Sequence, residues 1–545
     1  MLKWLTGRFK PTAGASATLL AQAQALRLQG EFEAARQACQ EVLHDAPGEA
    51  RALAMMAAVS ADQGQFDSGL QWARQALAAE RDCIPAHFAL GRLYEGAERH
   101  ADAEASYRRV VALDPAHAKA HTNLGCMLHI QGRLDEAVAC YRKALALEPG
   151  QPEALRNYAL IAGNGAQLQE ALEGFERHVA THPRDAGAHY QLGHLYLQHV
   201  DYERAEASYR RAIALEPEQA EFHFSLAQLL LVLGRYAEGW REYEWRWRME
   251  RFNGSMLRFP QPRWDGRRLE NGTLLVHGEA GFGDLFQFVR YVRLAAQRCA
   301  RVIVECQPAA CALIAGVEGV SQVVPQGADL PAFDAHIPLI AFPGVFESTL
   351  DTLPWPGPYI HADPERVQLW AARVAAAVPR ARKVGLVWSG DTTNAYNRDR
   401  AVTLQKLGPL AQAASVSFFS LQKGGPETQS GPVPAGMHFV DLTADLRDFS
   451  DTAALLTQLD LVICVDTGVA HLAAAMGRPT WVLLAFSPPW RHHVDRSDNP
   501  WYPGAMRLFR QQAQGDWSLA VQQMTQELIA WAASRSGQVP TMEAS

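Results

Sequence analysis

A repeat with a period of 34 residues constrains the first half of the chain more than any other feature of the sequence. Small residues recur at Ala23, Ala57, Gly91, Gly125, Ala159, Gly193 and Ala227. Prolines recur at Pro47, Pro115, Pro149, Pro183 and Pro217, and aromatic residues at Tyr107, Tyr141, Phe175, Tyr209 and Tyr243. A small residue lets two antiparallel helices approach closely, an aromatic residue wedges between neighbouring hairpins, and a proline ends a helix. The period therefore predicts a stack of helical hairpins.

The period and the residues at these positions resemble the tetratricopeptide repeat (TPR). Seven copies fit between residues 16 and 253, after an N-terminal tail at residues 1–15. The resemblance implies a superhelical solenoid whose concave groove binds a protein or peptide segment. The alternative is an array that only spaces or dimerises the rest of the protein.

The last repeat carries more tryptophan than the repeat itself requires, at Trp240, Trp245 and Trp247. We expect this aromatic helix to pack on the domain that follows it. Residues 254–272 are rich in proline, glycine and arginine, and they form the predicted linker to that domain.

The overall composition argues against several classes of protein. The formal net charge of −7 disfavours a dedicated nucleic-acid binder, because such proteins usually carry a basic excess. The sequence has no apolar run of about eighteen residues that would span a membrane, and we expect no secretory signal at its start. The eight cysteines form no C-x-x-C pair, which favours reduced thiols in a cytoplasmic protein over disulfides or a zinc site.

Short β-rich segments alternate with helical segments in the second half of the chain. Strands are predicted at residues 273–277, 302–306, 322–325, 336–340, 384–388, 417–421, 438–442, 461–465 and 480–484. This alternation is typical of parallel sheets that are covered by helices on both faces. We predict two Rossmann-like lobes, at residues 273–378 and 379–531, and a tail at residues 532–545. The chain is therefore expected to be multidomain, with an all-α solenoid followed by an α/β unit.

The first strand of this half ends in a glycine-rich loop with an acidic residue. The loop contains Gly278, Gly281 and Gly283, and Asp284 follows where a helix is predicted to begin. Glycines permit a tight turn and a close approach of the backbone to a ligand. Because ligands of such sheets bind beyond the carboxyl ends of the strands, Asp284 is a candidate general base for an acceptor hydroxyl. Its alternative role is an N-cap of the helix.

A second cluster of polar residues follows a strand of the second lobe. Asp466, Thr467 and Gly468 precede or begin a helix that includes Val469 and His471. The free amide groups and the dipole of this helix start suit an anion such as a diphosphate. Asp466 can accept hydrogen bonds from sugar hydroxyls, Thr467 can add a hydroxyl donor, and His471 lies near enough to reach the same ligand. The alternatives are simple helix caps for the first two residues and helix packing for the histidine.

The second half contains no D-x-D triplet, so we expect no metal ion to hold a diphosphate there. Cations would then stabilise the charge of the leaving group. The candidates are Arg398, Arg400 and Lys423, each of which lies in a segment that follows a predicted strand. Each of them can instead be a solvated surface charge.

These residues resemble those of the ADP-heptose:lipopolysaccharide heptosyltransferase family, whose members have the GT-B fold of two Rossmann-like lobes. The matching stretches are GFGD at residues 281–284 and VDTGVAHLAAAMGRPTWVLL at residues 465–484. The resemblance implies a glycosyltransferase that uses a nucleoside-diphosphate sugar, inverts the anomeric carbon and needs no catalytic metal or other cofactor.

The resemblance also assigns roles to individual residues. Asp284 would be the base that activates the acceptor hydroxyl, while Asp466, Thr467, Gly468 and His471 would hold the sugar and the diphosphate of the donor. The layout of a TPR array before a GT-B unit is similar to that of protein O-GlcNAc transferases, which suggests a protein or peptide acceptor. The alternative hypotheses are a non-catalytic TPR scaffold with a degenerate transferase half, and another α/β enzyme that uses a diphosphate compound.

An aromatic, proline-rich segment at residues 487–511 leaves three interpretations open. Its histidines, His492 and His493, can form a metal pair, or the segment can close over the donor at the edge of the cleft. The third interpretation is simple packing of Trp490, Trp501 and Tyr502. A helix at residues 516–531 is predicted to end the fold.

Overall fold

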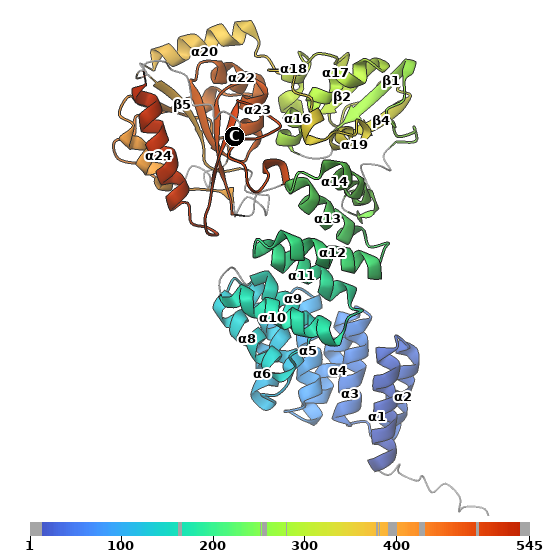
Figure 1. The fold of residues 1–545 in the computed structure, drawn as a ribbon. Coiled ribbons are helices and arrows are strands. Elements are labelled where there is room, and N and C mark those ends of the chain that lie inside the picture. Colours follow the sequence, from blue (N-terminus) through green and yellow to red (C-terminus); the bar gives the residue numbers. More distant parts are fainter. Residues whose placement is uncertain are drawn as a thin grey trace, which may run out of the picture. The chain divides into compact units, whose positions relative to one another are not determined.

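We analysed a computed structural model of the chain (Figure 1). It describes residues 13–161, 166–250, 252, 259–278, 281–377, 380, 382–390, 400–424, 431–486 and 490–534. The chain forms two compact units, Met1–Leu215 and Glu216–Ser545. Among the described residues, no helix is both long and apolar enough to cross a membrane. The eight cysteines are free thiols.

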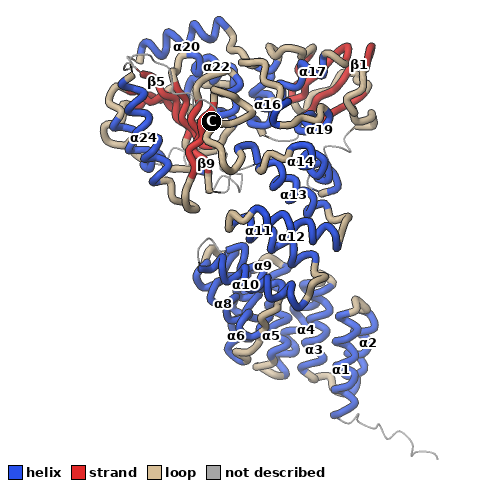
Figure 2. The backbone as a smooth tube through the Cα atoms, viewed as in Figure 1, coloured by secondary structure: helices blue, strands red, loops and turns tan. Residues whose placement is uncertain are grey.

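The first unit consists of antiparallel helix pairs, and successive pairs lie side by side (Figures 1 and 2). Its helices are α1 (Ala13–Leu28), α2 (Phe32–Asp45), α3 (Ala50–Asp62), α4 (Phe66–Ala79), α5 (Ile84–Gly96), α6 (His100–Leu113), α7 (Ala118–Ile130), α8 (Leu134–Leu147), α9 (Pro152–Ile161), α10 (Ala166–Thr181), α11 (Ala186–Gln198) and α12 (Tyr202–Leu215). The second helix of a pair ends two residues before the repeated proline, because the residue before a proline avoids the helical conformation. These pairs confirm the predicted TPR hairpins.

The repeated glycine and aromatic residue touch within one hairpin. A Cβ atom on Gly91 would lie 2.4 Å from Cε1 of Tyr107, so only glycine lets the ring of α6 rest on α5. The prediction that this aromatic residue wedges between neighbouring hairpins was therefore incomplete. The link to the next hairpin is a hydrogen bond, in which the Nδ2 group of Asn123 donates to the Tyr107 hydroxyl at 3.1 Å.

The second unit begins with the seventh repeat, which consists of α13 (Ala220–Val232), α14 (Tyr236–Tyr243) and the short helix η1 (Glu244–Arg248). Trp240 is buried and packs edge-on against Trp490, with the ring centroids 5.2 Å apart, which confirms that this helix docks on the domain that follows.

The other two tryptophans of the seventh repeat have different neighbours. Trp245 stacks on His223 of the same hairpin at 3.8 Å. Trp247 lies against the guanidinium of Arg246 at 3.9 Å. Arg263, which pairs with His336 of the first lobe, also lies 5.7 Å from the Trp247 ring, so Trp247 faces the following domain while Trp245 packs within the repeat.

The first lobe is built on a four-stranded parallel sheet with the order β3-β2-β1-β4. Its strands are β1 (Leu269–His277), β2 (Cys299–Cys306), β3 (Gln322–Pro325) and β4 (Ala335–Pro338). Its helices are α16 (Phe282–Phe288), α17 (Val292–Ala296), α18 (Cys311–Ile314) and α19 (Phe342–Val345), with short turns η2 (Val289–Tyr291), η3 (Pro308–Ala310), η4 (Leu339–Ala341) and η5 (Leu350–Thr352). The end of the predicted linker belongs to this lobe, because Trp264 is buried and its amide donates to the carbonyl of His336 at 2.8 Å.

The second lobe has a six-stranded parallel sheet with the order β10-β9-β8-β5-β6-β7. Its strands are β5 (Arg382–Val387), β6 (Val416–Ser420), β7 (Phe439–Asp441), β8 (Leu461–Val465), β9 (Thr480–Leu484) and β10 (Met506–Arg510). Its helices are α20 (Pro364–Ala376), α22 (Phe449–Thr457), α23 (Gly468–Ala475) and α24 (Ser518–Ala533), with short turns η6 (Leu404–Gln412), η8 (Thr443–Asp445) and η9 (Trp490–His492). Helix α24 covers one face of the sheet, and α22 and α23 cover the other (Figures 1 and 2).

Two features of this lobe differ from the prediction. Strand β10 was missed, because it is a short edge strand with an arginine at two of its five positions. Helix α20, which the sequence put in the first lobe, packs on α22 of the second. There Arg366 of α20 forms ion pairs with Asp448 at 2.7 Å and with Asp451 at 3.0 Å. The division between the lobes therefore lies before Pro364.

Candidate functional site

The two predicted clusters meet where the lobes touch. Helix α16 follows β1 of the first lobe, helix α23 follows β8 of the second, and the two helices contact one another. A Cβ atom on Gly283 would lie 3.0 Å from Cδ2 of His471. Phe282 of α16 also packs against Phe449 of α22, with ring centroids 4.5 Å apart. The residues that the sequence nominated in separate lobes are therefore neighbours.

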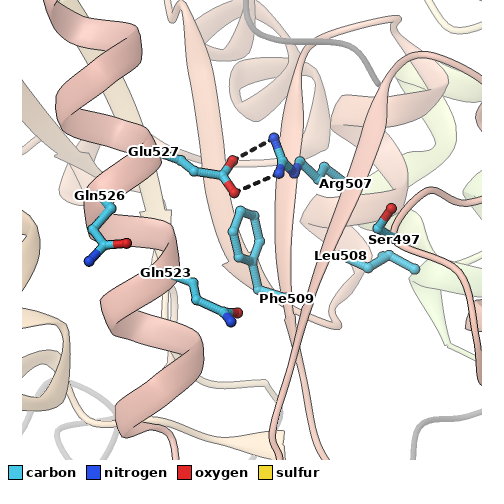
Figure 3. Close-up of a pocket in the computed structure, with 7 residues that line it drawn as sticks. All are labelled: Ser497, Arg507, Leu508, Phe509, Gln523, Gln526 and Glu527. Atoms are coloured by element: carbon cyan, nitrogen blue, oxygen red, sulfur yellow. Dashed lines mark hydrogen bonds and ion pairs between the residues drawn. The ribbon is translucent and has the colours of Figure 1, made fainter. Parts of the chain in front are cut away.

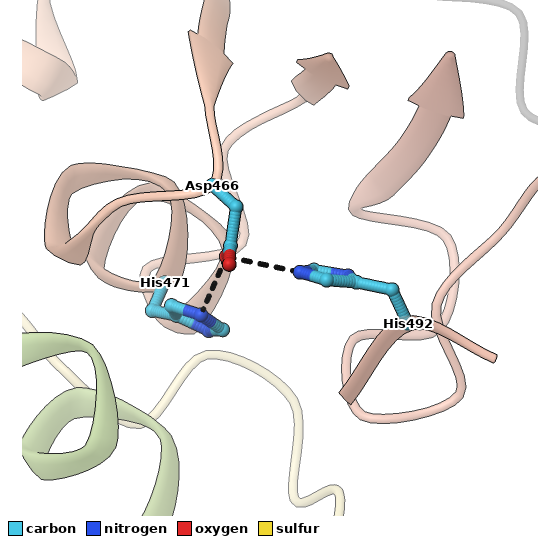
Figure 4. A group of neighbouring side chains, drawn as sticks. All are labelled: Asp466, His471 and His492. Atoms are coloured by element: carbon cyan, nitrogen blue, oxygen red, sulfur yellow. Dashed lines mark hydrogen bonds and ion pairs between the residues drawn. The ribbon is translucent and has the colours of Figure 1, made fainter. Parts of the chain in front are cut away.

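Asp466 is the centre of the second-lobe cluster (Figure 4). Its Oδ1 atom accepts a hydrogen bond from Nε2 of His492 at 3.0 Å and lies 3.4 Å from Nε2 of His471. The guanidinium of Arg400 lies 3.5 Å from Oδ2 and also donates to the Asp466 backbone carbonyl at 3.2 Å. Burial alone would raise the pKa of Asp466, but the two histidines outweigh it and hold that pKa well below its ordinary value. Asp466 is therefore an ionised carboxylate in a buried place.

The hydrogen bonds around His492 determine its tautomer. The backbone amide of Trp501 donates to Oδ1 of Asn499 at 2.9 Å, which leaves the Nδ2 group of Asn499 facing Nδ1 of His492 at 2.9 Å. The Nδ2 group of Asn499 can only donate, so Nδ1 of His492 accepts its hydrogen bond. The Nε2 atom of His492 then carries the proton that is donated to Asp466. Burial lowers the pKa of His492, which agrees with a neutral ring.

The same three side chains have the composition of a metal site. The ligand atoms of Asp466, His471 and His492 lie within 4.8 Å of one another. A metal would need the lone pair of Nε2 of His492, however, and Asn499 holds that nitrogen in its protonated form. The geometry therefore favours a hydrogen-bond network at this place, and independence from metal stays a prediction.

Asp284 of the first lobe is paired with an arginine of the second. The carboxylate contacts the guanidinium of Arg491, which also lies over the ring of Trp490 at 4.5 Å. The Nε atom of Arg491 is buried and has no hydrogen-bond partner in the described part of the chain, and burial lowers the pKa of this guanidinium. The consecutive residues Arg491 and His492 thus reach the two carboxylates that the sequence singled out.

The structure separates the predicted site residues from simple helix caps. The N-cap of α16 is Gly281, and Asp284 lies three residues later with its side chain on Arg491. Thr467 occupies the N-cap position of α23, but its side chain makes no capping hydrogen bond and its buried Oγ1 atom has no partner among the described residues. A cap therefore explains neither Asp284 nor Thr467, and their roles at a ligand stay predictions.

The glycines of the two clusters differ in what lies around them. A Cβ atom on Gly468 would lie 3.1 Å from Cβ of Phe282 and 3.5 Å from the amide nitrogen of Gly283. The lack of a side chain at Gly468 therefore lets the first lobe pack closely against α23. Packing against the first lobe accounts for this glycine, and its role at a ligand stays a prediction. A Cβ atom on Gly278 would lie 3.8 Å from the carbonyl of Glu305, whereas one on Gly281 would meet nothing within 4 Å.

The nominated cations have diverse surroundings. Arg400 contacts Asp466 as described, so it belongs to the cluster. Lys423 donates from its Nζ atom to the backbone carbonyl of Leu446, which directs its charge toward the backbone. Val469 is half-buried on the first turn of α23. Arg398 lies outside the described residues.

A separate hollow opens beside the edge strand β10 and helix α24 (Figure 3). It is lined by Ser497, Arg507, Leu508, Phe509, Gln523, Gln526 and Glu527. Arg507 and Glu527 form an ion pair at 2.5 Å across it, and burial raises the pKa of that glutamate. The hollow shares no residue with the cluster around Asp284 and Asp466.

Comparison with known families finds a match in each half of the chain. Tetratricopeptide repeat models match residues 26–93, 88–152, 131–188, 157–215 and 190–243. The model of glycosyltransferase family 9 (heptosyltransferase) matches residues 408–509. The chain joins tetratricopeptide repeats to a glycosyltransferase family 9 domain. The matched part of the family 9 domain contains Asp466, Thr467, Gly468, His471, Arg491 and His492.

Protein FlbA of Caulobacter vibrioides is 28% identical over 333 residues, which is 56% of this chain and 54% of that protein. The chain thus spans about half the length of the curated relative it matches. Among solved structures, a tetratricopeptide repeat protein of Parabacteroides merdae has 16% identity and a TM-score of 0.33, over 45% of this chain and 97% of its own. The type IV pilus biogenesis factor PilW has 20% identity and a TM-score of 0.35, over 39% of this chain and 100% of its own.

Sequence reasoning did not nominate Arg491, the arginine that contacts Asp284. The arginine lies in the aromatic segment at residues 487–511, whose closeness to the cleft the sequence did suggest. No spacing rule linked it to Asp284, since 207 residues separate the two. The two histidines of that segment face different partners, because His492 bonds to Asp466 and His493 bonds to Tyr236.

His493 should make the stability of the second unit depend on pH. Burial lowers its pKa to about 4, and its Nε2 atom lies 2.9 Å from the Tyr236 hydroxyl. A histidine in an unfolded chain has a pKa of about 6.5. Below that pH, His493 is therefore protonated in the unfolded state but stays neutral in the folded state. The free energy of unfolding should fall as the pH drops from about 6.5 toward 4, and by about 2 kcal/mol between pH 7.5 and pH 5.

Urea unfolding of the full chain at both pH values, followed by tryptophan fluorescence, measures this loss. The His493→Asn variant should lose about 2 kcal/mol less than the wild type between the same pH values. The exposed His361, replaced in the same way, is the matched control and should leave the pH dependence unchanged. Equal pH dependence of wild type and His493→Asn would contradict the neutral, buried ring.

Proposed function

We propose that the protein is a metal-independent inverting glycosyltransferase that takes a sugar from a nucleoside-diphosphate donor. The main support is that the segment matched by the family 9 model contains the Asp466 cluster. This cluster lies against α16, the helix that includes Asp284. Two carboxylates from two lobes at one contact suit a reaction between a donor and an acceptor. The hexosyl or heptosyl nature of the donor is left open by this proposal.

The proposed reaction begins at Asp284. An arginine in contact with a carboxylate favours its ionised form, which is the form that accepts a proton. The acceptor hydroxyl loses its proton to this carboxylate, its oxygen bonds to the anomeric carbon of the donor, and the bond from that carbon to the diphosphate breaks. Attack from the side opposite the leaving group inverts the anomeric centre.

The leaving diphosphate carries the charge that must be stabilised. The first turn of α23 offers the amide groups of Gly468 and Val469, and the hydroxyl of Thr467, which has no partner among the described residues, adjoins them. Arg400 and Arg491 supply positive charge, and the Nε group of Arg491 has no acceptor in the described part of the chain. Asp466 and His471 would bind sugar hydroxyls in this proposal.

The TPR module has a separate role in the proposal. Its concave groove recruits a protein or peptide segment, or a partner in glycan assembly, and brings the acceptor to the family 9 domain. No nucleic acid is expected as a partner, since the net charge of −7 disfavours it.

A second candidate function is a non-catalytic TPR scaffold with a degenerate transferase half. One observation favours it, namely that Phe282 and Gly283 cover the face of Gly468 where α23 begins. A donor can reach that helix start only if the lobes move apart. Nucleotide binding separates the two candidates, because a scaffold has no need of it.

The hydroxyl of Thr467 provides the test. We expect calorimetry with a panel of nucleoside diphosphates to find one that binds the wild type, and Thr467→Val to weaken that binding by about tenfold through loss of one charged hydrogen bond. The free energy of unfolding should stay level or rise, because the buried hydroxyl loses no partner within the described ranges of the chain.

Thr525→Val is the matched control, since its buried hydroxyl donates to the Val521 carbonyl at 2.7 Å in helix α24, outside the site. This variant should lose stability and keep nucleotide affinity. Failure of every nucleoside diphosphate to bind the wild type would reject the transferase and favour the scaffold. Unchanged affinity in Thr467→Val would show that the donor does not touch this helix start.

A further inference from the structure

Four consecutive residues connect the seventh repeat to the candidate site. We call residues 490–493 the strap. Trp490 packs edge-on against Trp240 of α14, and the Nε2 atom of His493 lies 2.9 Å from the hydroxyl of Tyr236 of α14. Between these anchors, Arg491 contacts Asp284 and His492 bonds to Asp466 at 3.0 Å. The outer two residues thus face a repeat helix, and the inner two face the carboxylates.

Trp240 touches the elements that carry both partners of the ion pair. Its ring lies 5.2 Å from that of Trp490 on the strap and 6.4 Å from that of Phe288. Phe288 is the last residue of α16, the helix that carries Asp284. Trp240 is only 3% exposed, so a single indole fills the space between α14, the strap and the first lobe.

The backbone of the strap also needs an anchor. His493 has a φ of 45°, in the left-handed region that residues other than glycine adopt at a cost of roughly 1 kcal/mol or more. Such a conformation persists where neighbours hold it, and the contact with Tyr236 lies on this residue. A Cβ atom on Gly234, just before α14, would lie 3.3 Å from Cε1 of His493, so the repeat approaches the strap closely.

We propose that the seventh repeat is a positioning element of the active site. Trp240 and Tyr236 hold the strap so that Arg491 stays on Asp284 and His492 stays on Asp466. The inference rests on the proposed transferase function, and it assigns a catalytic purpose to a repeat that otherwise reads as part of the solenoid. Trp240 and Tyr236 are positioning residues, because they act through the strap and touch neither carboxylate.

The first test compares two tryptophans of the same repeat in the full-length protein. Trp240→Ala should lower kcat for sugar transfer by about 10- to 100-fold, because displacing catalytic groups by about 1 Å can cost that much. The Kd of the nucleoside diphosphate should change by a smaller factor than kcat, because Arg491 is the only proposed diphosphate ligand that lies on the strap. Trp240→Phe, which keeps an aromatic ring, should recover most of the loss. Trp245→Ala is the control, since Trp245 stacks on His223 and contacts no strap residue among the described contacts.

A double-mutant cycle distinguishes positioning from general destabilisation. If Trp240 acts through Arg491, the double variant Trp240→Ala, Arg491→Gln should lose no more kcat than Arg491→Gln alone. Losses in Trp245→Ala and Arg491→Gln should multiply. The proposal would be overturned if the double variant lost kcat by the product of the two single-variant factors. Full kcat in Trp240→Ala would overturn it as well.

A milder variant covers the case in which Trp240→Ala fails to fold. Tyr236→Phe removes only the hydroxyl that contacts His493, keeps the ring, and should lower kcat by about 3- to 10-fold, on the scale of one hydrogen bond. Wild-type kcat in a folded Tyr236→Phe protein would count against the anchor at His493.

The positioning also has a readout that needs no turnover. Histidine ¹⁵N shifts report the tautomer, and His492 should show a neutral ring with its proton on Nε2 in the wild type and in Trp245→Ala. Trp240→Ala should lose that signature, because the strap no longer holds the ring against Asp466 and Asn499. An unchanged signature would reject the positioning role. If the wild type transferred no sugar, the proposed function would be rejected. The positioning role of the strap would still be tested by the tautomer of His492.

Discussion

Asparagine in place of Asp284 should lower kcat for sugar transfer by about 10²- to 10⁴-fold, the range typical for loss of a general base. Asparagine has the shape of aspartate but cannot take a proton from a hydroxyl at neutral pH. The Kd of the nucleoside diphosphate should stay the same or become tighter, because Arg491 loses its present anionic partner and is free to meet the diphosphate. Release of nucleoside diphosphate from the best donor of a panel, with calorimetry for binding, measures both quantities.

The control for this variant lies in the same lobe, at the amino ends of the strands. Asp334→Asn removes a carboxylate that accepts from the amide of Thr273 at 2.7 Å in the first lobe and touches no residue of the site. It should keep kcat within about threefold, since it affects only local stability. More than a tenth of wild-type turnover in a folded Asp284→Asn protein would reject Asp284 as the base, and the acceptor would then have to be activated by another group.

Methionine in place of Arg290 should lower the free energy of unfolding of the second unit by about 3–5 kcal/mol. Arg290 is 1% exposed and has no acidic partner among the described contacts. Its Nε group donates to the carbonyl of Gln287 at 2.6 Å, its Nη2 group donates to the Tyr359 hydroxyl at 2.7 Å, and its Nη1 group donates to the carbonyl of Trp501. Removing the guanidinium leaves buried acceptors without donors, which costs about 1–3 kcal/mol for each.

The rings around Arg290 add to this loss. The guanidinium lies 5.6, 4.8, 5.6 and 4.6 Å from the rings of Trp355, Tyr359, Trp501 and Tyr502. A buried cation gains on the order of 2 kcal/mol from such a face. These rings come from the segment between the lobes and from the second lobe, whereas Arg290 follows α16, so one side chain ties three parts of the unit together.

Urea unfolding at neutral pH, followed by tryptophan fluorescence, measures the effect of this change. Arg301→Met is the matched control, because Arg301 is exposed on strand β2 and should change the free energy of unfolding by less than about 0.5 kcal/mol. A loss below about 1 kcal/mol in Arg290→Met would mean that the aromatic surroundings adapt to methionine, and the arginine would not then hold the lobes.

The sequence alone was sufficient for most of the architecture. The period of small residues and prolines predicted the helix pairs, because close helix packing and helix termination depend on residues only one repeat apart. The predicted strands agree with β1 to β9 to within a few residues, since buried parallel strands appear as short apolar runs. Strand β10 was missed because edge strands need no such run.

Asp284 and the stretch from Asp466 to His471 could be nominated from the sequence because each follows a strand directly, and the carboxyl ends of parallel strands are where ligands bind. Local pattern could not decide whether Asp284 and Thr467 were caps. That depended on where their side chains point in the folded lobes. The local sequence also gave no sign of the close contact between Gly468 and Phe282, because Phe282 belongs to the other lobe.

The sequence by itself determined the repeats, the two parallel sheets and the two polar clusters, because those features depend on contacts between near neighbours in the chain. Only the tertiary structure decided that Arg491 meets Asp284, that His492 meets Asp466, and that Trp240 of a repeat packs on Trp490 beside them. Asp284 and Arg491 are 207 residues apart, and no periodicity or spacing encodes such a pair. It arises only when two lobes and a repeat helix pack together, since desolvated charges and aromatic rings find their partners in the assembled core.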